Sequence, residues 1–234
     1  VTQTRRVEQM RKDFVANVSH ELRTPLTAIQ GSTEVLLDGA LRNPVESRRF
    51  LEIMDKQLRH IQDLVTDMLK LAAVEEGRLP SRREDTKIDS LIQELIAVIQ
   101  PLANKKNQTL HVLVDPDIPP IKMDPYQIYD ALMNLLDNAV KYTQENGQIE
   151  LKTFIEGSNL VISVSDNGSG ISKEQLPRIF ERFYRVDKSR SREVGGTGLG
   201  LSIAKHGIEN HGGSISVESE LGKGTKFIVR IPVM

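Results

Sequence analysis

Hydrophobic residues recur at helical spacing in two long runs over the first third of the chain. In the first run, residues 5–37, Leu22, Leu26 and Ile29 lie three and four positions apart, which predicts an amphipathic helix with one buried stripe. The second run, residues 45–75, has a similar spacing over a broader apolar face. The chain is therefore expected to open with two long helices.

A turn joins these two helices, and a proline interrupts the first of them. Residues 38–44 contain a glycine and an Asn-Pro pair, which are typical of a turn. Pro25 predicts either a kink in the first helix or a boundary that splits it. An antiparallel hairpin of two helices cannot cover its own apolar seam, which includes Leu58 and Leu69. We therefore expect residues 1–77 to pair with a second copy as a homodimeric four-helix bundle.

Beyond residue 77 the pattern changes to shorter elements. Residues 78–83 are expected to be a linker, and residues 84–234 a second domain. The predicted helices are residues 91–104, 125–142 and 199–210. The predicted strands are residues 109–114, 148–155, 160–166, 214–220 and 225–231, and a further short strand is compatible with 83–87. This alternation predicts an α/β sandwich with its helices on one face of the sheet. The fold class is thus an α-helical hairpin followed by an α/β domain.

Two helix starts in the second domain carry recognisable caps. Asp89 or Ser90 is expected to cap the first of these helices, and Ser90 with Gln93 fits a capping box. Asp124 followed by Pro125 is a clear start for the second helix, because the cap residue directly precedes a proline.

Composition limits the classes of function. The 234 residues are 38% hydrophobic and 27% charged, with a formal net charge of -1, so neither nucleic acid nor an anionic membrane is expected as a partner. The chain has no cysteine, which excludes disulfides and cysteine-bound zinc and suits a reducing cytoplasm. No apolar run approaches the ~18–20 residues that span a bilayer. Because it begins with valine, the chain is interpreted as a piece of a longer protein.

His20 is the first candidate for chemistry. At about 100° per residue, it lies roughly 180–240° around the helix from the apolar stripe, so its imidazole is expected to face solvent. Thr24 lies about 40° from His20 and Glu21 about 100° from it, which places a hydroxyl and a carboxylate beside the ring. Taken alone, the pattern describes a solvated helix face as well as a reactive histidine.

Three polar residues form a stripe on a later helix. Asn134, Asn138 and Lys141 lie at positions i, i+4 and i+7. Amide oxygens suit Mg²⁺, which binds few protein ligands and keeps its waters and substrate phosphates, and Lys141 adds a positive charge. A solvated helix face would explain the same three residues.

Asp166 ends an alternating strand and points the same way as the apolar Ile162 and Val164. An inward carboxylate needs a hydrogen-bond partner, and the amino group of adenine fits that need. Residues 167–170, with two glycines, allow a close approach to the backbone. An ordinary Asp-Asn-Gly turn is the alternative.

A second glycine-rich segment, residues 195–201, precedes the last predicted helix, where N–H groups and the helix dipole favour phosphate. It lacks the ending of a P-loop, and Leu201 stands where a dinucleotide motif has its third glycine. Residues 178–193 hold six basic residues among aromatic ones, which suggests either nucleic-acid binding or a mobile flap over a triphosphate. The nearly neutral net charge favours the flap, and a solvated charged loop has the same composition.

Taken together, six segments resemble the motifs of the sensor histidine kinases of two-component signalling, in that family's order. Residues 19–25 resemble the phosphoacceptor box, 134–142 the asparagine box and 166–170 the first glycine box. Residues 180–185 resemble the phenylalanine box, 196–201 the second glycine box and 222–225 the last glycine box. Ser169 fills a place that an aliphatic residue often holds. The resemblance covers nearly the whole chain and implies a dimerisation and phosphoacceptor domain followed by a Bergerat-type ATP-binding domain.

The resemblance implies ATP-dependent phosphorylation of His20, transfer of the phosphoryl group to an aspartate of a response regulator, and phosphatase activity toward that regulator. Glu21 would orient the ring and accept its other proton, Thr24 would position water for the phosphatase, and Arg185 would act near the phosphates. Mg²⁺ would bind to Asn138. The residues implied for ATP are Asn134, Asn138, Lys141, Tyr142, Asp166, Gly168, Gly170, Gly196, Thr197, Gly198, Leu199, Gly200 and Thr225.

The resemblance also implies partners and a location. The hairpins would form the homodimer, and the regulator would dock near His20 and between Ile29 and Leu36. The chain would be the cytoplasmic portion of a membrane-anchored sensor and would itself make no membrane contact. Two alternatives are a nucleotide-binding dimeric scaffold without chemistry and a Bergerat-type ATPase that forms no phosphohistidine.

Overall fold

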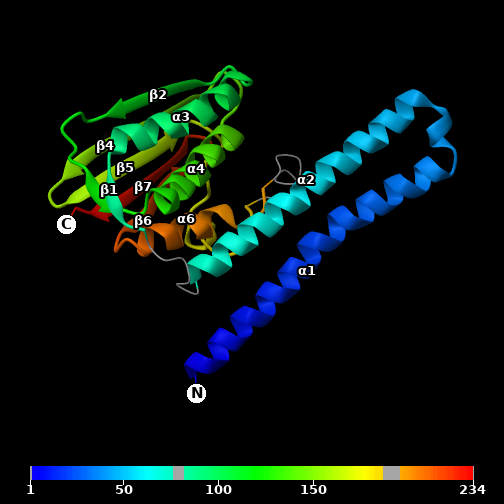
Figure 1. Cartoon of the computed structure of the whole chain (residues 1–234), viewed down its shortest axis with the longest axis horizontal. Coiled ribbons are helices and arrows are strands. Elements are labelled where there is room, and N and C mark those ends of the chain that lie inside the picture. The colour runs from blue at the N-terminus through cyan, green and yellow to red at the C-terminus, as the bar shows by residue number, and fades with distance from the viewer. Residues whose placement is uncertain (1, 76–81, 187–195, 234) are drawn as a thin grey trace. The chain divides into compact units, whose positions relative to one another are not determined.

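A computed structural model describes residues 2–75, 82–186 and 196–233 of the chain. Two compact units make up the fold, Val1–Leu69 and Lys70–Met234. The first is a helical hairpin and the second is a sheet with helices packed on it, as the hydrophobic pattern predicts (Figure 1).

The hairpin consists of α1 (Thr2–Leu37) and α2 (Pro44–Glu75), which run antiparallel (Figure 1). A short 3-10 helix, η1 (Ala40–Arg42), forms the turn between them. Asn43 Oδ1 accepts hydrogen bonds from the N–H groups of Val45 (3.1 Å) and Glu46 (3.5 Å), so Asn43 caps the start of α2.

Pro25 lies inside α1, which is one continuous helix. The alternative that Pro25 marks a helix boundary is therefore wrong. Pro25 is itself buried, and packing of an amphipathic helix can offset the backbone bond that a proline removes.

The apolar seam of the hairpin is only partly covered within one chain. Leu36 is 7% exposed and Leu64 is fully buried, but Leu26 is 55%, Leu58 is 50% and Leu69 is 67% exposed. The prediction that Leu26 lies in a buried stripe is thus wrong for the single chain. These exposed leucines leave apolar surface on the hairpin of the single chain.

The second unit is built on a five-stranded sheet of order β2-β4-β5-β7-β6. Its strands along the chain are β2 (Thr109–Val114), β4 (Gln148–Glu156), β5 (Asn159–Asp166), β6 (Ser214–Glu220) and β7 (Gly224–Pro232). The pairing of β2 with β4 is parallel, and the other neighbours are antiparallel. The predicted hairpins β4–β5 and β6–β7 are thereby confirmed.

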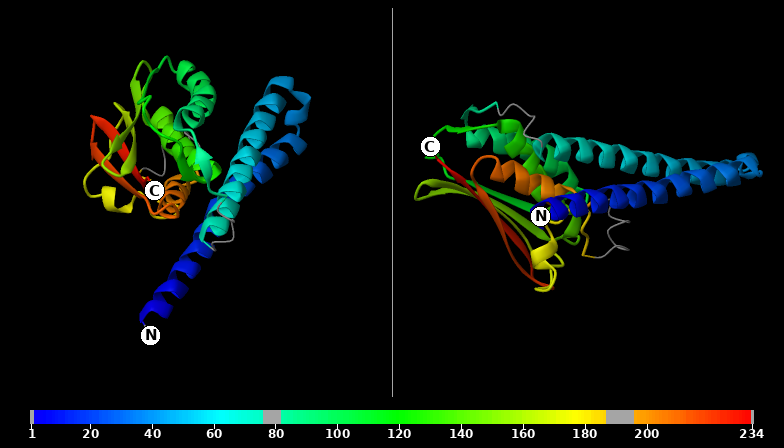
Figure 2. Two further views of the ribbon diagram at one scale, coloured as in Figure 1. Left: turned by 60° about the vertical axis from the view of Figure 1, so that its left-hand side comes forward. Right: turned by 90° about the horizontal axis from the view of Figure 1, so that it is seen from below.

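Three helices, α3 (Ile88–Asn104), α4 (Pro125–Tyr142) and α6 (Gly200–Glu209), cover one face of this sheet (Figure 2). Leu132, Leu135 and Leu136 of α4 are fully buried against the sheet residues that share the same core, such as Ile162 and Val164 of β5. Each fully buried leucine contributes about 2 kcal/mol relative to an exposed one, so α4 is held firmly along its apolar side. The predicted α/β sandwich is confirmed.

A second, two-stranded sheet pairs β1 (Glu84–Thr86) with β3 (Ile121–Met123). The compatible short strand at 83–87 is thus real, but it lies outside the main sheet. The sequence pattern did not reveal β3, because three residues are too few to show a period of two.

The start of α3 differs from the prediction. The helix begins at Ile88, with Lys87 at the N-cap and no side-chain cap there, so the capping box at Ser90 is wrong. Gln93 instead donates to Asp89 Oδ2 (2.9 Å) within the helix. The earlier start buries Ile88, which is 2% exposed, and keeps the Asp89 carboxylate in the first turn, where the helix dipole favours it.

The start of α4 is as predicted. Asp124 Oδ1 accepts from the N–H groups of Tyr126 (3.1 Å) and Gln127 (3.2 Å). The N–H of Asp124 in turn donates to His211 Nε2 (2.9 Å), and the other ring nitrogen of His211 lies 2.7 Å from the Gly207 carbonyl. His211 therefore joins the start of α4 to the end of α6.

The stability of the second unit should fall as the pH drops below about 6.5, the ordinary pKa of histidine. His211 must be neutral, because Nδ1–H donates to Gly207 while Nε2 accepts from Asp124, and burial lowers its pKa, an effect that the Arg83 guanidinium reinforces. The unfolded chain thus binds this proton at a higher pH than the fold does, so the stabilisation is complete above 6.5 and is lost at lower pH.

Thermal unfolding of the wild type and of His211→Gln between pH 5 and pH 8 checks this expectation. The variant should melt lower at pH 8 and depend less on pH than the wild type. Parallel curves for the two proteins would show that His211 is not the group responsible.

Candidate phosphoacceptor and nucleotide site

His20 lies on the exposed side of α1, as predicted. Thr24, one turn later, is also exposed, and its hydroxyl donates to the His20 carbonyl at 3.5 Å, which is a long bond. Glu21 is half-buried beside them. The structure therefore brings an accessible imidazole, a carboxylate and a hydroxyl together on one short stretch of helix.

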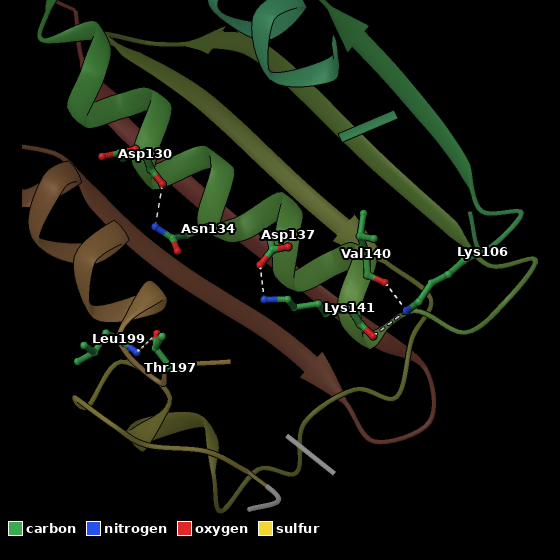
Figure 3. A network of polar contacts seen from close by, with 8 residues as sticks. All are labelled: Lys106, Asp130, Asn134, Asp137, Val140, Lys141, Thr197 and Leu199. Atoms are coloured by element: carbon green, nitrogen blue, oxygen red, sulfur yellow. Dashed lines mark hydrogen bonds and ion pairs between the residues drawn. The ribbon is translucent and has the colours of Figure 1, made fainter. Parts of the chain in front are cut away.

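The polar stripe of α4 lies beside its buried leucines. Asn134, Asn138 and Lys141 are all half-buried. Asn134 Nδ2 donates to the Asp130 carbonyl (2.8 Å), and Lys141 Nζ pairs with Asp137 Oδ2 at 2.6 Å (Figure 3). The stripe is thus ordered by bonds along the helix itself.

Asn134 also sets the distance between α4 and the second glycine-rich segment. A Cβ at Gly200, the first residue of α6, would collide with Asn134 Oδ1. With the Asn134 side chain in this position, glycine at residue 200 lets the start of α6 lie close to the polar stripe of α4.

Asp166 ends β5 with its carboxylate held in place by backbone donors. Its Oδ1 accepts from the Gly168 N–H at 2.8 Å, and it lies opposite Thr225 of β7 in the strand register. Burial raises the pKa of Asp166, while hydrogen bonds from the backbone of Gly168 and Thr225 lower it. A charge kept in such a place suits a ligand that donates a hydrogen bond to it.

The second glycine-rich segment leads into α6 as predicted, one residue later than expected. Thr197 is 8% exposed, and its Oγ1 accepts from the Leu199 N–H at 3.2 Å. Leu199 stands at the N-cap of α6, and its side chain accepts no hydrogen bond from the first N–H groups of the helix. Such a helix start suits the phosphate groups of a nucleotide.

The predicted phenylalanine box is anchored to the sheet. The rings of Phe180 and Phe227 of β7 meet edge to face, with centroids 6.4 Å apart. Phe183 adopts φ 61, and its N–H donates to the carbonyl of Gly198 (2.8 Å), which has φ 74. Arg185 follows in the same segment and is half-buried. Of the flap predicted within residues 178–193, residues 187–193 lie outside the described residues.

The last glycine box packs against the end of β5 at Asp166. A Cβ at Gly224 would collide with the Asp166 carbonyl, and the hydroxyls of Thr225 and Ser219 lie 2.9 Å apart. Gly168 packs on the Tyr142 carbonyl at the end of α4. Contacts therefore link the predicted ATP segments in pairs: Gly200 approaches Asn134, Gly168 approaches Tyr142, and Thr225 lies opposite Asp166.

Two of the site contacts that were not predicted differ in the signal that the sequence gives. The pairing of Asp137 with Lys141 has the i, i+4 spacing that a search for charge pairs on helices finds. The contact of Phe183 with Gly198 has no such signal, because it depends on two left-handed backbone conformations far apart in the chain.

Two domain-family descriptions match the chain. Residues 10–77 match the "His Kinase A (phospho-acceptor) domain", and residues 123–234 match the "Histidine kinase-, DNA gyrase B-, and HSP90-like ATPase". The catalytic domain of the histidine kinase ThkA is 30% identical, with a TM-score of 0.56, and the match covers 66% of this chain and 99% of that one. The chain belongs to the sensor histidine kinases.

Other relatives extend the likeness of this histidine kinase chain to both units. The phosphate regulon sensor protein PhoR of Pseudomonas aeruginosa is 40% identical over 227 residues, which are 97% of this chain and 51% of PhoR. The structure of ThkA in complex with the response regulator protein TrrA has a TM-score of 0.79 at 26% identity, over 98% of this chain and 64% of that chain. The chain spans about half or less of the length of the curated relatives it matches.

One further finding concerns membranes. Among the described helices of this histidine kinase chain, none combines the length and the apolar character needed to cross a bilayer.

Proposed function

We propose that this chain transfers the terminal phosphoryl group of ATP to His20 and then passes it to an aspartate of a response regulator. The observation that carries the proposal is the exposed imidazole of His20 inside the segment that matches the phosphoacceptor family. The second unit matches an ATPase family and contains the half-buried Asp166, which supports ATP as the phosphoryl donor.

On the acceptor side, the reaction uses the His20 ring and the Glu21 carboxylate of α1. The unprotonated ring nitrogen attacks the γ-phosphorus, a nitrogen–phosphorus bond forms, and the bond from phosphorus to the bridging oxygen breaks to release ADP. The proton on the other ring nitrogen passes to the Glu21 carboxylate. In the second transfer a carboxylate oxygen of the regulator attacks phosphorus, the nitrogen–phosphorus bond breaks, and the proton returns from Glu21 to give the neutral ring.

The second unit positions the nucleotide. The Asp166 carboxylate accepts from the adenine amino group, the helix start after Gly198 binds the phosphates, and Lys141 and Arg185 offset their charge. The further ATP residues that we propose are Asn134, Asn138, Tyr142, Gly168, Gly170, Gly196, Thr197, Leu199, Gly200 and Thr225.

Mg²⁺ fits this site only together with the nucleotide. Within residues 2–75, 82–186 and 196–233, no group of three or more His, Asp or Glu side chains could hold a metal ion, whereas the half-buried amide of Asn138 offers one hard oxygen ligand. We propose that Asn138 and the phosphates share the ion, which neutralises phosphate charge when it is bound.

We further propose a homodimer through the hairpins. Leu26, Leu58 and Leu69 leave apolar surface on one chain, and a four-helix bundle from two chains would cover it. The response regulator is proposed to dock near His20 and between Ile29 and Leu36, because ThkA, which shares the fold over both units, forms a complex with a response regulator. The chain is proposed to act in the cytoplasm as part of a longer sensor.

The full chain with γ-labelled ATP and Mg²⁺ tests the proposal. A phosphohistidine label should appear that is stable in alkali and lost in acid. Nucleotide binding without label would instead favour a dimeric scaffold, and steady release of phosphate without label would favour an ATPase.

Thr24→Ala is expected to spare autophosphorylation and to slow dephosphorylation of the regulator by about 10- to 100-fold, because the hydroxyl would position the attacking water. Dephosphorylation of a labelled receiver domain measures the effect. Thr27→Ala is a matched control, since the Thr27 hydroxyl also bonds the backbone of α1, at the Arg23 carbonyl (3.0 Å). Equal loss of both activities in Thr24→Ala would contradict the assigned role.

A further inference from the structure

The last turn of α4 ends in carbonyl groups that a lysine from another part of the chain binds. Lys106, in the turn between α3 and β2, donates from Nζ to the carbonyls of Val140 (2.8 Å), Lys141 (3.0 Å) and Thr143 (3.3 Å). Figure 3 shows the side chain reaching the first two of these. An ammonium group at this place satisfies orphan carbonyls and faces the negative end of the helix dipole.

Gln108 adds a second set of donors to the same place. Its Nε2 donates to the carbonyls of Val140 (3.1 Å) and Thr143 (2.9 Å), and at 3.4 Å to that of Gln144. Gln108 is 4% exposed. The carbonyls of Val140 and Thr143 thus accept from both Lys106 and Gln108, and loss of both donors would leave buried carbonyls without these partners. We call Lys106 and Gln108 the α4 clamp.

The backbone beneath the clamp is itself fixed. The Lys106 carbonyl accepts from the Asn146 N–H (3.0 Å), and the Thr109 N–H donates to the Gly147 carbonyl (2.9 Å). The turn before β2 and the turn after α4 therefore hold each other. A lysine on such a base is already oriented toward its carbonyls, which lowers the entropy cost of the three bonds.

The residues that the clamp holds belong to the nucleotide site. The turn it binds carries Lys141 and Tyr142, and Asn138 lies just before it. The Tyr142 carbonyl accepts from the Ser169 N–H at 3.3 Å and packs on Gly168. Movement of this turn would therefore displace both the polar stripe of α4 and the loop that follows Asp166.

We propose that Lys106 and Gln108 are positioning residues for ATP, which keep the last turn of α4 in the conformation that binds the nucleotide. This inference rests on the proposed function of the second unit. Helix ends open at low free-energy cost, and affinity falls in proportion to the fraction of molecules in the competent conformation. The clamp raises that fraction without touching the ligand.

Lys106→Met in the full chain tests the proposal, because it keeps the aliphatic stem and removes all three donated hydrogen bonds. The Kd for a non-hydrolysable ATP analogue with Mg²⁺ should rise about 5- to 20-fold, within the usual range of coupling between sites. Amide hydrogen exchange at residues 141–144 should become faster. Lys105→Met, at the exposed neighbouring lysine, is the matched control and should change the Kd less than twofold.

Val112→Ala, on the edge strand β2 of the sheet order β2-β4-β5-β7-β6, is a second control that tests whether a general loss of stability alone weakens binding. Measured well below the melting temperature of each variant, Val112→Ala should bind the analogue as the wild type does. An unchanged Kd for Lys106→Met, or an equal rise for Val112→Ala, would overturn the inference. A wild-type chain that binds no ATP would contradict the proposed function instead.

Discussion

His20→Gln is expected to abolish phosphoryl incorporation from ATP and to leave ATP binding unchanged. Glutamine keeps a polar side chain of similar length on the exposed side of α1, so the helix should tolerate it, but its amide has no nucleophilic lone pair to attack phosphorus. Without a covalent acceptor there is no phosphoenzyme, and transfer to a regulator stops as well. The loss should be complete within detection, since no neighbouring residue offers a second imidazole on this turn.

Autoradiography after incubation with γ-labelled ATP measures this effect, and binding of an ATP analogue checks the nucleotide site. His111→Gln, at an exposed histidine of β2, is the matched control and should label like the wild type. Label that persists in His20→Gln would place the phosphoacceptor elsewhere and remove the basis of the proposed function.

Asp166→Asn is expected to weaken ATP binding by about 100-fold, close to the upper end for a hydrogen bond to a charged group. Oδ1 of Asp166 is engaged by the Gly168 N–H, so an asparagine that keeps this bond would present its NH₂ group at the second position. That group is a donor and would face the adenine amino group, which is also a donor. The variant thus replaces an attraction by a repulsion.

The same substitution should change the melting temperature of the second unit by no more than a few degrees. Because burial raises the pKa of Asp166 above its ordinary value of 3.8, ionisation begins to cost stability as the pH rises through 3.8, and the full cost applies above the raised pKa; asparagine removes it. The hydrogen bonds to backbone donors are partly lost in exchange.

Titration calorimetry with an ATP analogue and thermal unfolding of the same samples measure the two effects. Asp117→Asn, at an exposed carboxylate, should change neither. Wild-type affinity in Asp166→Asn would exclude this carboxylate as the adenine partner, and unfolding of the variant at room temperature would show that its role is structural.

The parts of the fold that local sequence determines were predictable. The start of α4 is an example, because Asp124 and Pro125 supply the cap and the first helical residue within two positions. The start of α3 was not, since burial of Ile88 outweighed a plausible capping box at Ser90. Tertiary packing decided between two local solutions of similar energy.

The site shows the same division. Sequence spacing placed Asn134, Asn138 and Lys141 on one face of α4, because a helix repeats every 3.6 residues. Spacing could not predict that Lys106 would reach the end of that helix, since the contact joins residues more than thirty positions apart. It also could not show that Leu26 stays exposed in one chain, because a periodic pattern records an apolar face and not its partner.

The parallel pairing of β2 with β4 has a consequence for the order of folding. The hairpins β4–β5 and β6–β7 join neighbours in sequence and can form early, whereas the pairing of β2 with β4 closes a longer loop that contains β3 and α4. The helix that we assign to the nucleotide therefore lies within the loop that closes when β2 joins the sheet. Substitutions that destabilise α4 should therefore slow the pairing of β2 with β4 during refolding as well as lower the affinity for ATP.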